Sequence, residues 1–206
     1  MTWNEVFCNT FKELRKRISP EVRKQVDLML PSWPMVDACR ADSLDAFLPF
    51  IAAGKLSIED MHQACDRYYL GKTKTGTPIY WMIDDMNTPL DAHIGDRWIS
   101  QLLKNREPLI ANWQVQHCLF GLHLLAHAES PISIVESESS AIVLSALFPE
   151  TIWLAYATTT HLVPDLFAPL EGHIVTIYPN TDPTLSTYLF FQDLVTLTQE
   201  YYDIDI

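Results

Sequence analysis

Carboxylate and amide side chains follow two apolar segments of the chain at the points where these segments end. Glu136 and Glu138 come after the run Ile-Ser-Ile-Val. Asn180 and Asp182 come after the run Ile-Val-Thr-Ile-Tyr-Pro. If both runs are neighbouring parallel strands, their carboxyl ends lie at one edge of the sheet, which is where such sheets bind ligands. Mg²⁺ takes one or two carboxylates, so the spacing predicts a magnesium site, although such acids are also ordinary helix N-caps.

From residue 131 onward, short apolar runs alternate with segments of helical periodicity. The predicted strands cover residues 132–135, 151–157, 173–178 and 201–204, and the predicted helices cover residues 139–148, 161–167 and 184–199. Alternation of this kind favours a parallel sheet with crossover helices on its faces. The predicted fold class is therefore α/β, with the parallel sheet in residues 131–206.

The preceding residues predict a helical lead and a small antiparallel sheet. Helical signals favour helices over residues 3–17, 20–30 and 56–66, a helix start at Asp42/Ser43 and a connector over 31–40. Turn signals and alternation predict an antiparallel meander with strands at 68–70, 78–83 and 90–94. Residues 96–128 are predicted to be mostly helical, most clearly from Cys118 to His127. We expect an N-terminal lead (1–40), a segment of helices and meander (41–130), and the α/β domain (131–206).

The first predicted helix, over residues 3–17, is amphipathic and basic. Its apolar stripe consists of Trp3, Val6, Phe7, Phe11 and Leu14. The one basic cluster of the chain comprises Lys12, Arg15, Lys16, Arg17, Arg23 and Lys24. Within it, the candidates for phosphate contacts with nucleic acid are Lys12, Arg15, Lys16 and Arg23. A solvated helix face is favoured over that role by about four to one, because charge runs usually are such faces.

The net charge of −12 is unevenly distributed along the chain. Residues 107–206 hold 12 of the 26 acids and no Lys or Arg. Because proteins bind nucleic acid by replacing its counterions with Lys and Arg, direct nucleic-acid binding by this half is disfavoured. No apolar run reaches the ~18 residues of a membrane span, and the N-terminus lacks an uncharged signal core. The sequence therefore predicts a cytoplasmic protein without a membrane partner.

The histidines suggest a metal site, whereas the spacing of the cysteines excludes one kind of metal site. His123 and His127 lie four residues apart near His117, a spacing that metal sites use. Without an HExxH pattern, a metal role is weighted at about one in ten against a structural role. The four cysteines contain no CxxC pair, which excludes a zinc ribbon.

The pattern of residues 131–206 resembles a toprim domain, the metal-binding module of bacterial primases, type IA and type II topoisomerases and certain nucleases. That family has a strand ending in Glu-Gly, a second strand with a Gly-containing turn, and a third strand followed by Asp-x-Asp. The matching positions here are Val135-Glu136-Ser137 and Asn180-Thr181-Asp182. A longer resemblance, over about residues 42–206, is to an uncharacterised group of bacterial toprim-like proteins associated with mobile elements and primase-type genes. It rests on the segments 68–71, 79–84, 118–121, 134–138 and 153–155.

The resemblance implies site residues and a cofactor. Glu136 would be the catalytic general acid or base, and the Asp-x-Asp positions would hold Mg²⁺ for phosphoryl or nucleotidyl transfer. Asn180 stands in place of the first Asp, which removes a negative ligand. Because Glu138 could restore that charge, the candidate metal ligands are Asp182, Glu138 and Asn180.

Two further departures from the family pattern bear on function. Ser139 replaces a Lys that is usual in the toprim-like group, and the turn Thr158-Thr159-Thr160 lacks the family's Gly. The leading hypothesis is a catalytically degenerate relative of primase-type toprim proteins that acts through protein interaction in the machinery of a mobile element. The first alternative is a Mg²⁺-dependent phosphoryl-transfer enzyme, of nuclease or primase type. The second is an acidic protein that mimics DNA.

Overall fold

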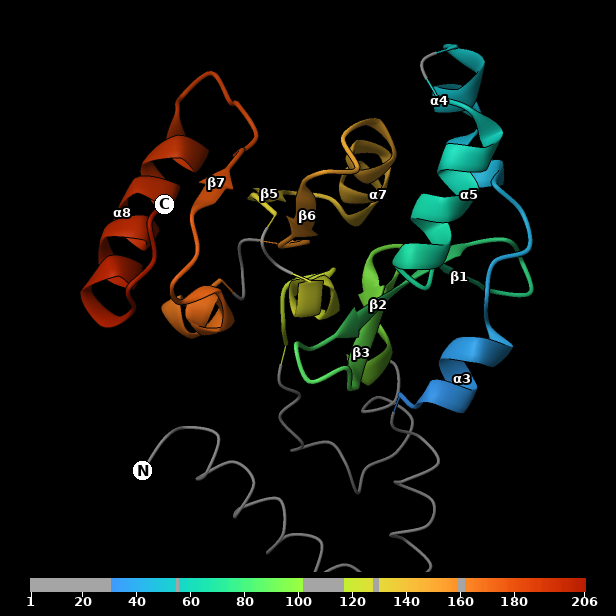
Figure 1. Ribbon diagram of the computed structural model, residues 1–206, viewed down its shortest axis with the longest axis horizontal. Helices are drawn as coiled ribbons and strands as arrows, with labels where there is room; N and C mark the ends of the chain where they lie inside the picture. The colour runs from blue at the N-terminus through green and yellow to red at the C-terminus, as the bar shows by residue number, and fades with distance from the viewer. Residues whose placement is uncertain (1–30, 55, 102–116, 128–129, 159–161) are drawn as a thin grey trace, which may run out of the picture.

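The computed structural model contains two sheets with helices around them (Figure 1). It describes residues 31–54, 56–101, 117–127, 130–158 and 162–206. The helices predicted over 3–17 and 20–30, and with them the basic cluster, lie outside the described residues. A mixed α/β architecture with an antiparallel and a parallel sheet confirms the predicted fold class at that level. Among the described helices, none combines the length and the apolar character that crossing a membrane requires.

The described chain begins with short helices that lead into a longer one. These elements are α3 (Trp33–Ala38), the 3-10 helix η1 (Asp45–Phe47), α4 (Leu48–Ala52) and α5 (Ile58–Arg67). The helix predicted over 56–66 is confirmed as α5, and the Ser57 side chain caps it by accepting a hydrogen bond from the backbone N–H of Asp60. The connector predicted over 31–40 is wrong. Pro34 stands in the first turn of α3, where a proline costs no backbone hydrogen bond.

The antiparallel sheet is a four-stranded meander. Its strands are β1 (Gly71–Lys72), β2 (Pro78–Ile83), β3 (Pro89–Ile94) and β4 (Arg97–Trp98), paired in the order β1-β2-β3-β4. The strands predicted at 78–83 and 90–94 are confirmed, but the strand predicted at 68–70 is wrong. Tyr68 ends α5, and the Leu70 N–H donates to the Cys65 carbonyl across a turn in which Tyr69 has φ +54°.

The parallel sheet has three strands, with the order β6-β5-β7. Its elements are β5 (Ile132–Val135), α7 (Glu138–Leu147), β6 (Ile152–Ala155), the 3-10 helix η5 (Pro164–Leu170), β7 (Val175–Ile177) and α8 (Ser186–Tyr201). Every residue of β5 and β6 is buried, as expected of strands covered on both faces. The predicted alternation of strands and helices is therefore confirmed for β5, α7, β6, β7 and α8. The helix predicted at 161–167 is instead the 3-10 helix η5, three residues later in the chain.

Two predicted elements of this half are wrong. The strand expected at 201–204 is absent from the described structure, where α8 extends to Tyr201 and only one bridge, between Ile174 and Asp205, adds to the sheet edge. The α-helix expected over 118–127 is a 3-10 helix, η3 (Leu122–His127), preceded by extended chain. Phe120 in that extended part pairs with Ala155 of β6, so the sheet takes up backbone groups that a helix would have used.

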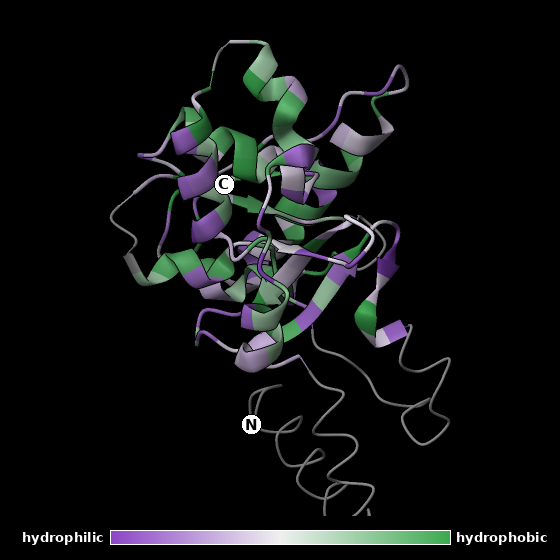
Figure 2. Cartoon of the chain, turned by 90° about the vertical axis from the view of Figure 1, so that its right-hand side faces the viewer, coloured by the Kyte–Doolittle hydropathy of each residue, from purple (hydrophilic) through white to green (hydrophobic). Residues whose placement is uncertain are grey.

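One hydrophobic cluster joins the two sheets. Helices α5 and α7 pack against each other, and α7 also packs on β6 (Figure 1). Buried side chains from α5, β2, β4, β5, α7 and β6 belong to a single cluster, which includes Met61, Met82, Trp98, Val135 and Ala141. The buried Tyr68 hydroxyl donates to the Trp153 carbonyl at 2.6 Å, which links the end of α5 to the parallel sheet. Hydrophobic and hydrophilic residues alternate in bands along the helices, as expected of elements packed on one side (Figure 2).

Candidate functional site

The two predicted groups of polar side chains leave the same edge of the parallel sheet. β5 and β7 are adjacent parallel strands, with Ile132 opposite Val175 and Ile134 opposite Ile177. The pairing continues past the strand end, where the Tyr178 N–H donates to the Ile134 carbonyl at 2.8 Å. The condition on which the predicted site depended, that these strands are neighbours, is therefore met.

Asp182 uses its carboxylate to begin a helix. One oxygen, Oδ1, accepts from the backbone N–H groups of Thr184 (2.9 Å) and Ser186 (3.1 Å) and from the Thr184 hydroxyl. The other, Oδ2, accepts from the N–H of Thr187 at 2.9 Å. These bonds, above all the one from the Thr184 side chain, hold the pKa of Asp182 well below its usual range. Asp182 thus satisfies N–H groups at the start of α8 that have no partner within the helix.

Glu138, the first residue of α7, turns toward the antiparallel sheet. Its side chain is buried, and Oε1 lies 2.7 Å from Nδ1 of His93 in β3. The hydrogen bond with this carboxylate raises the pKa of His93. The His93 ring also stacks on Trp98 of β4, with 4.9 Å between ring centroids. Glu138 and His93 therefore form a partly buried ion pair, when the imidazole is protonated, that joins the two sheets.

His93 is a residue that the sequence analysis missed. One signal was available, because the alternation of β3 places His93 on the same face as Asp91. Asp91 is fully buried, and its carboxylate accepts hydrogen bonds from the Ala92 and Ser100 N–H groups and from the Ser100 hydroxyl. Two polar side chains in a row on a buried face indicate polar partners elsewhere in the fold.

Glu136 and Tyr156 carry the unsatisfied polar atoms of this sheet edge. Among the described contacts, neither Oε2 of Glu136 nor the Tyr156 hydroxyl has a hydrogen-bond partner, although both atoms are buried. Burial, and then the charge of Glu136, raises the pKa of Tyr156 to about 12, and the backbone of Asn180 acts in the opposite direction. Glu136, Tyr156 and Asn180 therefore lie near one another where β5, β6 and β7 end.

The turn after β6 contains a residue in the left-handed backbone conformation, which glycine adopts without strain. Ala157 has φ +59°, in the left-handed region that costs a residue with a Cβ about 1 kcal/mol or more. Its N–H donates to the Glu136 carbonyl at 2.9 Å, so the turn is tied directly to the end of β5. The sequence predicted the turn at 158–160, whereas its left-handed residue, Ala157, lies one position earlier.

These residues do not fit a Mg²⁺ ion as the structure arranges them. Both oxygens of Asp182 cap α8, one oxygen of Glu138 is bonded to His93, and Asn180 has no charge. Among the described residues, no three His, Cys, Asp or Glu side chains gather in a way that could hold a metal ion. Glu138 therefore does not replace the charge lost at Asn180, because its carboxylate is engaged with His93 of the antiparallel sheet.

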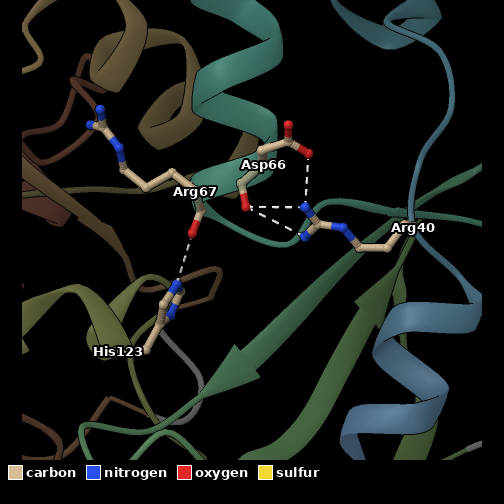
Figure 3. Close-up of polar contacts among 4 residues, drawn as sticks. All are labelled: Arg40, Asp66, Arg67 and His123. Carbon is tan, nitrogen blue, oxygen red and sulfur yellow. Dashed lines mark hydrogen bonds and ion pairs between the residues drawn. The ribbon is translucent and has the colours of Figure 1, made fainter.

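His123 has a structural environment rather than that of a metal ligand. Its Nε2–H donates to the Arg67 carbonyl at 3.1 Å, and burial lowers its pKa, so the ring is neutral near pH 7 (Figure 3). The backbone carbonyl of Asp66, the residue before Arg67, accepts hydrogen bonds from the Arg40 guanidinium at 3.3 and 3.4 Å (Figure 3). The two side chains thus satisfy the last carbonyls of α5, which have no partner within that helix. The basic candidates Lys12, Arg15, Lys16 and Arg23 lie outside the described residues.

One family model matches the chain. It carries the description "Domain of unknown function (DUF6371)" and matches residues 45–181, which begin at η1 and end just after β7. No curated protein matches the chain significantly.

Proposed function

The chain belongs to the family of the domain of unknown function DUF6371, and we propose that its residues 131–206 form a catalytically degenerate toprim-like domain that acts through protein interaction. In this proposal the domain descends from a primase-type protein that used Mg²⁺, and it now serves the replication or mobility machinery of a mobile element. The resemblance of the sequence supports the mobile-element setting. The geometry of the residues after the strands supports the loss of metal binding.

The observation that carries the proposal is the engagement of the two carboxylates that would hold a metal. The Asp182 oxygens accept bonds from the first turn of α8, and the Glu138 oxygen is bonded to His93. Releasing either carboxylate to a cation would leave a helix terminus or a histidine without its partner, and for the buried Glu138 the loss would cost about 1–3 kcal/mol. The strand order, the Glu after β5 and the left-handed residue after β6 support descent from a working domain.

Calorimetric titration of Mn²⁺ and Mg²⁺ into the full chain tests the proposal. We expect no binding below about 1 mM, because an isolated carboxylate holds these ions weakly. Asp182→Asn is the informative variant, and Asp193→Asn, an exposed carboxylate on α8, is the matched control. Micromolar binding that Asp182→Asn abolishes and Asp193→Asn leaves intact would contradict the degenerate state. The interaction itself is tested by a pull-down with the full chain, which should retain a protein partner with and without chelator.

One observation favours a second candidate, the phosphoryl-transfer enzyme. Glu136 keeps a buried oxygen without a hydrogen-bond partner among the described contacts, as a general acid or base aimed at substrate would. In this candidate Glu136 exchanges a proton with the reacting group, and Asp182 has to leave the terminus of α8 when the metal binds. Nuclease and nucleotidyl-transfer assays with Mn²⁺ decide between the two, since activity that Glu136→Gln abolishes would establish the enzyme.

The acidic composition favours the third candidate, a DNA mimic. Residues 107–206 present acids without any Lys or Arg, as a surface that occupies a DNA-binding partner would. A complex of this kind weakens steeply as salt rises. Raising the salt from about 50 to about 200 mM screens attraction between exposed charges. A captured partner whose affinity changes little over that range would exclude mimicry and would leave the interaction proposal unchanged.

A further inference from the structure

One face of the parallel sheet is covered over β5 and β6 but exposed over β7. Ser133 of β5, Trp153 of β6 and Thr176 of β7 lie opposite one another, so their side chains point to the same face of the sheet. Helix α7 packs on β5 and β6, and its Ala141 belongs to the same apolar cluster as Trp153. Ser133 and Trp153 are buried, whereas Thr176 is exposed. The face that α7 covers on two strands is therefore open to solvent on the third.

Two exposed aromatic rings lie at this open part of the sheet. Tyr178, which follows β7, is 52% exposed, and Phe148, the C-cap of α7, is 47% exposed. Both rings contact Trp153, with ring centroids 5.9 Å and 6.2 Å from that of the tryptophan. The Trp153 indole N–H donates to the Phe148 carbonyl at 3.3 Å, which ties the tryptophan to the end of α7. We call Phe148, Trp153 and Tyr178 the aromatic platform.

The segments next to the aromatic platform carry negative charge. Glu150 is exposed in the turn that follows Phe148. Asp203 and Asp205 are exposed beside the outer edge of β7, where the Val175 N–H donates to the Asp205 carbonyl at 2.7 Å. Residues 107–206 contain no Lys or Arg that could neutralise these acids. A cation that approaches the platform is therefore attracted by acids from two segments of the chain.

Exposed aromatic rings among acids favour a cationic ligand over a nucleic acid. Rings that stack the bases of single-stranded nucleic acid stand in a positively charged groove. A guanidinium within about 6 Å of a ring centroid is attracted to the face of the ring, and its planar shape allows it to stack there. Among the described contacts, no cation of the chain lies over Phe148 or Tyr178. Arg67 of α5, which reaches α7, donates instead to the Ser145 hydroxyl at 2.9 Å.

We propose that the aromatic platform binds an arginine-containing segment of a protein partner. Arginine side chains of that segment stack on Phe148 and Tyr178, and Glu150 attracts their charge. An extended peptide advances about 3.3 Å per residue. Arginines about four residues apart therefore reach both rings, since each ring contacts Trp153. This inference rests on the proposed function, because it gives the chemistry of the partner through which the domain would act.

Fluorescence anisotropy of a labelled peptide, titrated with the full chain, tests the proposal. The probe is a peptide of alternating arginine and glycine, about ten residues long, so that its extended length of about 33 Å exceeds the span of the platform. In the control peptide, citrulline replaces each arginine, which keeps the shape of the side chain and removes its charge. We expect Tyr178→Ala and Phe148→Ala each to weaken binding of the arginine peptide about fivefold, which is the loss of one cation–π contact of about 1 kcal/mol. The citrulline peptide should bind more weakly than either variant binds the arginine peptide.

Matched variants separate stacking from apolar contact and from the net charge of the chain. Tyr188→Ala removes a ring of α8 that is 51% exposed, nearly as much as Tyr178, and should change nothing. Tyr178→Phe keeps the ring and should bind like the unaltered chain. Phe148→Leu keeps an apolar side chain but should lose as much affinity as Phe148→Ala, because leucine offers no π face. Glu150→Gln should weaken binding at low salt and have little effect at high salt, where its charge is screened.

Three results would overturn the inference: equal binding of the citrulline peptide, equal losses on Tyr188→Ala and Tyr178→Ala, or tighter binding of oligothymidine than of the arginine peptide. The first indicates an uncharged partner, the second attraction by net charge alone, and the third a nucleic acid. The pull-down judges the proposed function separately. A partner that the unaltered chain and Tyr178→Ala capture equally well would refute the platform as the site and leave protein interaction unchanged. An unaltered chain that captures nothing would count against protein interaction, while peptide binding that depends on Tyr178 would still establish the platform.

Discussion

The pair formed by His93 and Glu138 gives the strongest test of how the two sheets are joined. In the folded chain the Glu138 carboxylate raises the pKa of His93 above its usual value of 6.5, whereas in the unfolded chain that neighbour is gone. Between these two pKa values the folded chain binds more protons than the unfolded chain. The contribution of the pair to stability is therefore complete below about pH 6 and is lost as pH rises through the raised pKa.

Glu138→Gln removes the charge and keeps the shape of the side chain. A hydrogen bond to a charged group contributes about 1.5–3 kcal/mol when it is partly buried, and a neutral one about 0.5–1.5 kcal/mol. We expect the variant to lose about 2 kcal/mol of unfolding free energy at pH 5.5 and about half of that at pH 8.5. For a chain of this length the loss at pH 5.5 lowers Tm by about 4–8 °C.

Urea denaturation at several pH values between 5 and 9 measures this effect. Glu150→Gln is the matched control, because the same change at an exposed position should alter stability by less than about 0.5 kcal/mol. The reasoning is refuted if Glu138→Gln costs the same at pH 5.5 and pH 8.5, or no more than the control. His93→Gln should abolish the same pH dependence, since it removes the group that titrates.

Three further substitutions, one of them with a control substitution, test local features of the fold by denaturant unfolding. Ala157→Gly should stabilise the chain by about 1 kcal/mol, because it relieves the left-handed conformation after β6; a loss of stability would mean that this turn is not strained. Gly121→Ala should cost more than about 2 kcal/mol, since a Cβ there would lie 2.8 Å from the Tyr68 ring. Gly95→Ala, also at positive φ but with no atom within 4 Å of the added Cβ, should cost only about 1 kcal/mol, and equal costs would contradict the packing argument. Tyr68→Phe should cost about 1–3 kcal/mol by leaving the buried Trp153 carbonyl unpaired, whereas a change under about 0.5 kcal/mol would show that water replaces the hydroxyl.

Local signals predicted the elements whose residues decide their own conformation. The Ser57 cap of α5, the four buried residues of β5 and the alternation of β2 were all visible in the sequence, because capping and periodicity act over a few residues. The same signals failed where two local preferences competed. Tyr68 to Leu70 carry strand-forming side chains, but α5 continues through Arg67 and a left-handed Tyr69 turns the chain.

The placement of the candidate site at one sheet edge was also predictable. Apolar runs followed by Glu136 and by Asn180 indicate two parallel strands. The carboxyl ends of parallel strands lie at the same edge of a sheet, so the polar residues that follow them also lie at that edge. The adjacency of β5 and β7 was stated only as a condition, because the sequence does not specify which strands of a parallel sheet are neighbours.

The sequence alone determined which residues carry charge, which segments are amphipathic, and the order in which strands and helices follow one another from β5 to α8. The tertiary structure alone decided what each carboxylate does. His93 and Glu138 are 45 residues apart in the chain and meet only because α7 packs against the antiparallel sheet. Periodicity describes a segment and its faces, whereas a side chain's partner depends on the position of every element packed around it, which no local pattern contains.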